Sequence, residues 1–208
     1  KKDVKGMPVD KVSNMLRGEA GTTFELKVKR TGEKKPLSFK ITRETIRVPQ
    51  VPYYGLLQPG VGYICLTGFA DGAGKEMRQA LLELKKQGAD RLILDLRDNP
   101  GGSLDESVDI ANLFIPKGKK VVYTKGKMAS TNRDFYTAVE PVDTVMPLVV
   151  MVDGGTASSA EIVSGSLQDM DRAVIIGTRT FGKGLVQMIR DLPYGGNLKI
   201  TTSRYYIP

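Results

Sequence analysis

Two short segments carry the residue types that could do chemistry. The run Gly-Thr-Ala-Ser-Ser-Ala-Glu, which begins at Gly155, places Ser158 and Ser159 at a predicted helix start. Further along, Lys183 stands between two glycines. The chain contains no histidine, so a serine nucleophile served by a histidine base is impossible within it. A serine hydrolase made from these residues would need a lysine as its base, and Lys183 is the candidate.

The segment around the two serines is predicted to be a strand–turn–helix junction. An apolar run over 147–152 predicts a buried strand, and periodic apolar residues over 158–167 predict a helix. Such a junction exposes one side chain and aims the free N–H groups of the helix N-terminus at it. A serine there could attack a carbonyl while the N–H of Ser159 stabilises the oxyanion. In the alternative interpretation the serines only cap the helix, with Glu161 as the capping-box partner of Ser158.

A second glycine-rich turn occupies residues 98–102, Asp-Asn-Pro-Gly-Gly. It joins a predicted buried strand to a helix, and strand-to-helix turns of an α/β sheet converge at one end of the sheet. The free N–H groups of this turn could therefore complete an oxyanion hole beside the serine. On its own the motif is equally typical of a tight structural turn.

Lys183 also invites comparison with a phosphate-binding loop. Residues 177–183 match that pattern as far as the lysine, but Gly184 stands where a serine or threonine should follow, and no helix is predicted next. We therefore reject nucleotide binding. A lysine acting as base must be neutral, which requires desolvation, and Phe181 is a candidate to provide it.

The elements that must position these residues alternate between strand and helix after residue 55, which predicts an α/β core. Before that point there is too little apolar material for an independent core. Residues 48–55 are predicted to be a linker or entry strand, and 125–145 an aperiodic excursion over the active-site face. Strands are predicted over 22–29, 37–41, 61–69, 91–96, 121–124, 147–152 and 173–177, helices over 7–17, 75–87, 104–114 and 158–167, and a hairpin over 185–207 that turns at 194–197.

Composition narrows the function classes. The chain has 208 residues and a net charge of +8, but its basic residues are scattered rather than gathered in the patch that nucleic-acid binding requires. No apolar run approaches the roughly 20 residues that span a bilayer. The single cysteine, Cys65, lies in an apolar run and is predicted to be buried packing rather than a reactive thiol.

At the residues above, the sequence resembles the carboxyl-terminal processing (tail-specific) serine proteases. The resemblance implies that Ser158 is the nucleophile, Lys183 the general base and Gln187 the residue that orients the lysine. Oxyanion donors would be the backbone of Ser159 and of Gly101 or Gly102. The family's Ser-Ala-Ser-Ala-Ser-Glu reads Thr-Ala-Ser-Ser-Ala-Glu here, which leaves Ser159 as an alternative nucleophile. The matching blocks are 95–102, 156–162, 167–169, 172–173 and 180–187.

The resemblance also implies a crotonase-like core over 44–208, preceded by the C-terminal half of a PDZ domain over 1–43. The expected function is a serine endopeptidase that cleaves proteins or peptides near exposed C-termini in the periplasm or cell envelope. No metal or cofactor and no nucleic acid are expected, and membrane association only through parts outside this chain. Two alternatives are a non-catalytic peptide-binding scaffold of the same family and a crotonase-like enzyme acting on acyl-thioesters.

Overall fold

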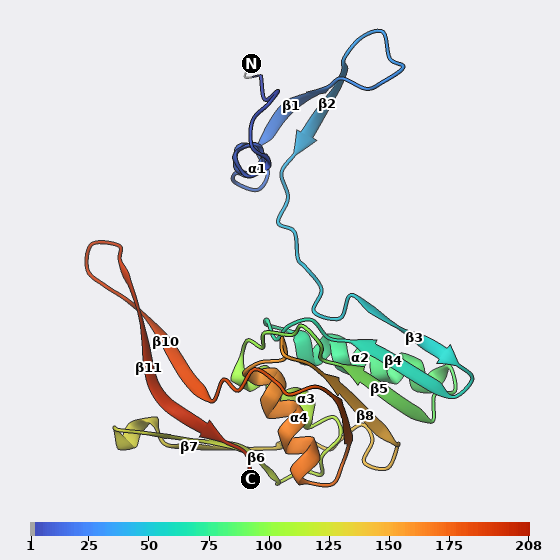
Figure 1. The fold of residues 1–208 in the computed structure, drawn as a ribbon, viewed down its shortest axis with the longest axis vertical. Helices are drawn as coiled ribbons and strands as arrows, with labels where there is room; N and C mark the ends of the chain where they lie inside the picture. The colour runs from blue at the N-terminus through green and yellow to red at the C-terminus, as the bar shows by residue number, and fades with distance from the viewer. Residues whose placement is uncertain (1–2) are drawn as a thin grey trace. The chain divides into compact units, whose positions relative to one another are not determined.

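The computed structural model describes residues 3–208 and divides into two units, one that ends at Val48 and one that spans Pro49–Pro208 (Figure 1). The first unit holds α1 (Val9–Leu16) and an antiparallel pair, β1 (Thr23–Val28) and β2 (Leu37–Thr42). None of its described residues is buried. This exposure agrees with the expectation that the first unit has no hydrophobic core of its own. The units part a few residues beyond the boundary that the sequence predicted, between residues 43 and 44.

The central sheet of the second unit has the order β3-β4-β5-β8-β9. Strands β4 (Val61–Cys65), β5 (Arg91–Asp95), β8 (Leu148–Val152) and β9 (Val174–Gly177) are parallel, and β3 (Tyr53–Gln58) pairs antiparallel with β4. The predicted strands are confirmed, although β4 ends at Cys65 rather than at residue 69. The predicted linker or entry strand over 48–55 leads into β3.

Three helices, α2 (Ala73–Lys86), α3 (Leu104–Ala111) and α4 (Ser159–Asp169), pack around this sheet. Their apolar faces meet strand side chains such as Ile64, Leu94 and Val150, which have no solvent exposure. Cys65 is half-buried rather than fully buried, and burial raises the pKa of its thiol.

Because β4, β5, β8 and β9 are parallel, their carboxyl ends lie at one edge of the sheet, and the two glycine-rich turns leave the sheet there.

A second, antiparallel sheet has the order β10-β11-β6-β7. Strands β10 (Leu185–Asp191) and β11 (Asn197–Tyr206) form the predicted hairpin, which projects from the unit in Figure 1, and β11 also pairs with β6 (Lys120–Gly126). The prediction that residues 125–145 form an aperiodic excursion is wrong. This segment contains a 3-10 turn (Ala129–Thr131) and β7 (Arg133–Tyr136), which pairs with β6.

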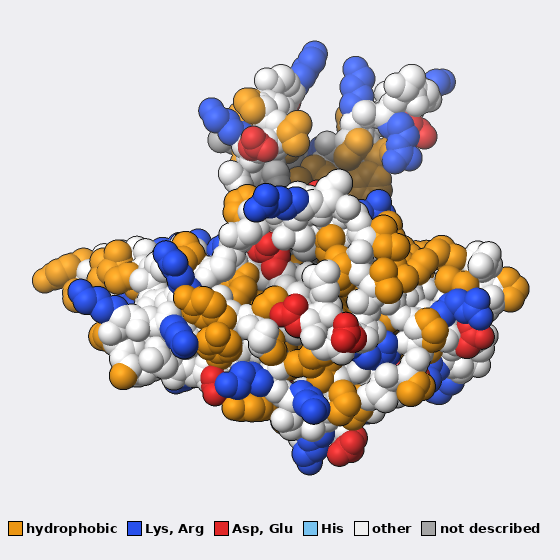
Figure 2. Space-filling view, turned by 60° about the horizontal axis from the view of Figure 1, so that its bottom comes forward, with side chains coloured by type: hydrophobic (Ala, Val, Ile, Leu, Met, Phe, Trp, Pro, Cys, Tyr) orange, Lys and Arg blue, Asp and Glu red, His pale blue; other side chains and the backbone are white. Residues whose placement is uncertain are grey.

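The molecular surface has no single concentration of charge on the face shown in Figure 2, where lysine and arginine side chains are dispersed among apolar and neutral ones. Among residues 3–208, no helix has the length and apolar character that crossing a bilayer would require.

Candidate active site

The serine turn has a strained backbone. β8 ends at Val152 and α4 begins at Ser159, and between them Ser158 adopts φ 56° and ψ −117°. An ordinary N-cap residue lies in the β region of backbone conformation. A non-glycine residue with a positive φ, as at Ser158, instead costs of order 1–3 kcal/mol of conformational free energy. Ser158 is half-buried, while Ser159 is only 1% exposed. Ser158 therefore occupies the sharp corner that exposes a side chain in such junctions.

The side chain of Ser159 is committed elsewhere. Its hydroxyl donates to the carbonyl of Gly102 at 2.9 Å, which joins the serine turn to the other glycine-rich turn. This contact shows that Ser159 serves as a link between the two turns.

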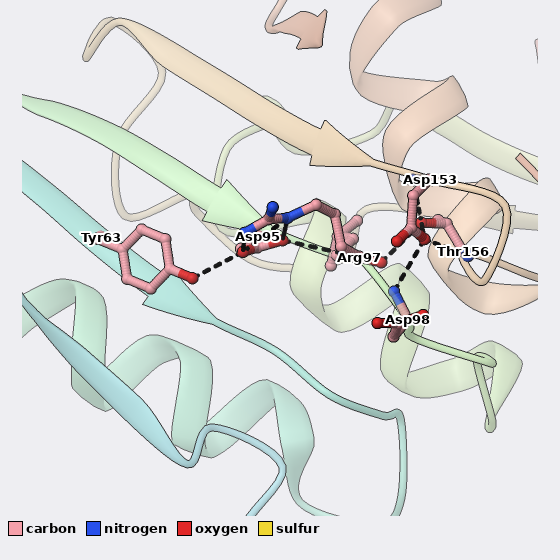
Figure 3. A network of polar contacts seen from close by, with 7 residues as sticks. Tyr63, Asp95, Arg97, Asp98, Asp153 and Thr156 are labelled. Carbon is pink, nitrogen blue, oxygen red and sulfur yellow. Dashed lines mark hydrogen bonds and ion pairs between the residues drawn. The ribbon is translucent and has the colours of Figure 1, made fainter. Parts of the chain in front are cut away.

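A group of polar side chains at the carboxyl ends of β5 and β8 fixes the two turns to each other (Figure 3). Asp153 accepts the N–H of Asp98 at 2.9 Å, and the hydroxyl of Thr156 donates to the carbonyl of Leu96 at 2.7 Å. The N–H of Asp98, together with those of Gly155 and Thr156, lowers the pKa of Asp153 against the opposing effect of burial. A carboxylate that accepts several N–H groups prefers its charged form.

Next to this group, Asp95 is the last residue of β5, and its carboxylate accepts hydrogen bonds from the side chains of Arg97 and Tyr63 (Figure 3). Burial raises the pKa of Asp95, but the hydrogen bonds from Arg97 and Tyr63 outweigh it, and the net shift is downward. Burial and the hydrogen bond to Asp95 raise the pKa of Tyr63 to about 12. These hydrogen bonds to Asp95 fix the backbone at the point where β5 passes into the glycine-rich turn.

The two glycines of that turn have different surroundings. Gly101 has φ +87°, and a Cβ on it would lie 2.6 Å from the carbonyl oxygen of Ala157 and 2.9 Å from the Cβ of Ser158. Only glycine allows this approach. The N–H of Gly101 donates to the side chain of Asn99 at 2.9 Å. In contrast, the N–H groups of Gly102 and Ser159 make no hydrogen bond within residues 3–208.

Glu161, on the first turn of α4, connects the serine turn to the lysine loop. Its Oε2 accepts the N–H of Ser158 and the N–H of Lys183, both at 2.8 Å. Its Oε1 accepts the hydroxyl of Thr180 at 2.7 Å and the N–H of Gly182 at 2.6 Å. The capping-box interpretation identified the first of these contacts, and the others are long-range contacts that no sequence pattern indicated.

A second side chain touches the same two residues. The hydroxyl of Tyr205 donates to the carbonyl of Ser158 at 3.2 Å and to the carbonyl of Lys183. Tyr205 was absent from the sequence-based site, since a tyrosine near the end of a strand carries no signal of its own. A pocket of about 520 Å³ opens here, and its lining includes Glu161, Lys183 and Tyr205.

Within residues 3–208, no hydrogen bond joins the side chains of Ser158, Lys183 and Gln187, which the sequence predicts to act together. Lys183 is half-buried, and Gln187 is exposed on β10, where it pairs with Thr201 next to a β-bulge. Phe181, the predicted shield of the lysine, is 68% exposed and does not bury it. The structure thus brings the backbones of Ser158 and Lys183 together around Glu161 and Tyr205.

Comparison with known proteins gives a consistent family. Residues 60–208 match the model of peptidase family S41. A carboxyl-terminal-processing protease of Synechocystis sp. is 39% identical over 99% of this chain and 48% of its own length. A probable CtpA-like serine protease of Staphylococcus epidermidis is 38% identical over 99% of the chain and 41% of its own length.

Solved structures give the same answer. One described as a photosystem II D1 C-terminal processing protease has a TM-score of 0.67 and 33% identity, and covers 98% of this chain and 56% of its own. A putative S41 protease from Bacteroides fragilis has a TM-score of 0.68 at 20% identity, covering 95% of this chain and 58% of its own, and shows likeness of fold alone. The chain spans about half the length of these relatives.

The carboxylate of Glu161 should be required to hold the lysine loop. In Glu161→Gln, one of the two oxygens becomes an NH₂ group. The hydroxyl of Thr180 can accept from that group, but a backbone N–H on the same side has no acceptor, so at least one hydrogen bond is lost and the others lose their charge. Each charged hydrogen bond contributes about 1.5–3 kcal/mol, so amide exchange at Gly182 and Lys183 should accelerate at least about tenfold. Glu140→Gln, an exposed matched control, should leave it unchanged. Unchanged protection in Glu161→Gln would contradict this role.

The contact between Asp153 and Asp98 should weaken in acid. Because the pKa of Asp153 is lowered in the folded chain, its stabilisation is fully present above the ordinary value of about 3.9 and is lost as pH falls through the lower folded value. Exchange protection of the Asp98 and Gly155 amides, relative to that of Leu94 in β5, should fall below about pH 4. Asp153→Asn should remove this pH dependence, and an identical acid response in that variant would argue against the assignment.

Proposed function

The chain belongs to peptidase family S41, and from that premise we propose that it carries the core of a serine endopeptidase with Ser158 as nucleophile and Lys183 as general base. The observation that carries the proposal is that one carboxylate, Glu161, binds the N–H of both residues. The absence of histidine leaves a lysine as the base available near Ser158. The partial exposure of Ser158 and the commitment of Ser159 to Gly102 favour Ser158 as the nucleophile.

The reaction follows from these roles. The neutral amine of Lys183 takes the proton of the Ser158 hydroxyl as its oxygen attacks the substrate's peptide carbonyl. The tetrahedral intermediate collapses, and the lysine ammonium gives that proton to the leaving amine, which leaves an acyl ester on Ser158. Lys183 then takes a proton from a water molecule that attacks the ester, and returns it to the Ser158 oxygen as the acid product departs.

The oxyanion of each tetrahedral intermediate needs two N–H donors. Those of Ser159 and Gly102 are suitable, since neither has a partner among the described residues. The N–H of Gly101 is engaged by Asn99, so we assign the second donor to Gly102 and a steric role to Gly101.

The hydrogen bond from Ser158 to Lys183 must form for the first step. Catalytic hydrogen bonds are often long or poorly aligned before substrate binds and tighten in the complex. The position of Gln187 on β10, four residues after Lys183, is compatible with its contacting the lysine amine once that side chain turns toward Ser158. We propose for Gln187 this orienting role.

Substrate class and location follow from the family. We propose that the protein cleaves proteins or peptides near exposed C-termini, because the Synechocystis relative matched over 99% of the chain is a carboxyl-terminal-processing protease. By the same family resemblance we propose that it works in the periplasm or cell envelope. We further propose that the crotonase-like core expected over 44–208 corresponds to the unit Pro49–Pro208, and that the C-terminal half of a PDZ domain expected over 1–43 lies in the unit that ends at Val48. The relatives align with 99% of the chain, so this first unit has counterparts in them.

Substitution of the two serines tests the nucleophile. In the full-length protein, Ser158→Ala should abolish peptide cleavage and labelling by a fluorophosphonate probe. Ser159→Ala should remain labelled at a reduced rate, because it keeps the backbone N–H but leaves the carbonyl of Gly102 without its partner, a cost of about 1–3 kcal/mol. Melting temperatures report folding in both. Labelling of Ser158→Ala but not of Ser159→Ala would move the nucleophile by one residue. A folded, unlabelled wild-type protein would instead support a peptide-binding scaffold.

Two substitutions of Lys183 test the base. Lys183→Ala and Lys183→Arg should both eliminate turnover without unfolding the protein, since an arginine side chain stays protonated at any working pH. Turnover by Lys183→Arg at the wild-type rate would contradict the assignment of Ser158 and Lys183 as nucleophile and base.

A further inference from the structure

Tyr205 lies near the end of β11 and reaches across to the first turn of α4. Its ring is half-buried and packs against the core of the second unit. Its hydroxyl contacts the carbonyl oxygens of Ser158 and Lys183, two residues that lie far from it in the sequence. Its backbone N–H donates to the carbonyl of Gly184 at 3.1 Å. One residue therefore touches both halves of the proposed catalytic pair.

The contacts of Tyr205 complement those of Glu161. Glu161 accepts the N–H groups of Ser158 and Lys183, and Tyr205 donates to the C=O groups of the same two residues. A hydroxyl has one proton, so the two carbonyls share it, and both must stay within reach of a single oxygen atom. Together the two side chains restrain both residues at their N–H and C=O groups.

The hydroxyl keeps its proton under working conditions. Burial, and then the negative charge of Glu161, raise the pKa of Tyr205 well above its ordinary value. The hydroxyl therefore remains protonated and can donate to both carbonyl oxygens.

We propose that Tyr205 is a positioning residue for the Ser158–Lys183 pair, one whose hydroxyl sets the separation of the two backbones so that the lysine amine can reach the serine hydroxyl. This inference rests on the proposed function and extends it. The physical basis is that transfer of the serine proton tolerates little displacement, since a misplacement of about 1 Å can cost about 100-fold in rate.

The test is Tyr205→Phe in the full-length protein, which removes the hydroxyl and keeps the ring. We expect kcat for peptide cleavage, and the rate of fluorophosphonate labelling, to fall about 10- to 100-fold while KM changes less than about threefold. The matched control is Tyr123→Phe on the neighbouring strand β6. The ring centroids of Tyr123 and Tyr206 are 5.2 Å apart in a stacked arrangement, and within residues 3–208 the hydroxyl of Tyr123 makes no hydrogen bond. The substitution Tyr123→Phe should leave both rates unchanged.

A double substitution separates positioning from a general effect on folding. If the hydroxyl acts through the lysine, Tyr205→Phe should not slow the residual labelling of Lys183→Ala any further. A loss of the same size in that background, or a lower melting temperature with unchanged kcat per labelled site, would overturn the inference. So would an unaffected Tyr205→Phe in an active protein. If the unmodified protein neither cleaves nor labels, it is the proposed function that fails, and this inference falls with it.

Discussion

The carboxylate of Glu161 is the interaction on which the rest of the site depends. It lies on the first turn of α4, where the free N–H groups of a helix favour negative charge. Its two oxygens collect four donors from the serine turn and the lysine loop. No other hydrogen bond within residues 3–208 joins the side chain of one of these segments to the other. The loop after β9 has no secondary structure of its own to hold Lys183. This carboxylate positions it together with the hydrogen bonds from the N–H of Phe181 to the carbonyl of Thr156 and from the hydroxyl of Tyr205 to the carbonyl of Lys183.

The remaining polar groups fix the other side of the serine. Asp153 and Thr156 secure the serine turn to the end of β5, and Asn99 takes the N–H of Gly101. The hydroxyl of Ser159 then holds the carbonyl of Gly102. Within residues 3–208, the N–H groups of Ser159 and Gly102 at this corner make no hydrogen bond. Two unused donors at one corner are what an oxyanion requires.

This arrangement has a stability cost that the core offsets. Ser158 is held at a positive φ, and a non-glycine residue persists there only when the surroundings over-determine its conformation. The fully buried side chains of α2, β5 and β8 supply that rigidity, because their packing fixes both strand ends from which the turns depart. The strain at Ser158 therefore accompanies the placement of a half-buried serine at the edge of a packed sheet.

The sequence by itself located most of the elements and indicated the candidate catalytic residues. Apolar runs and periodicity located most strands and helices, and the absence of histidine with a glycine-flanked lysine pointed to Ser158 and Lys183. It missed β7 and the roles of Asn99 and Tyr205, and it could not choose between Gly101 and Gly102. Those features depend on partners far apart in the chain, such as Tyr205 and Ser158, 47 residues apart. Local patterns report which side of an element is apolar, whereas only the packed tertiary structure decides which N–H and C=O groups find partners and which remain free.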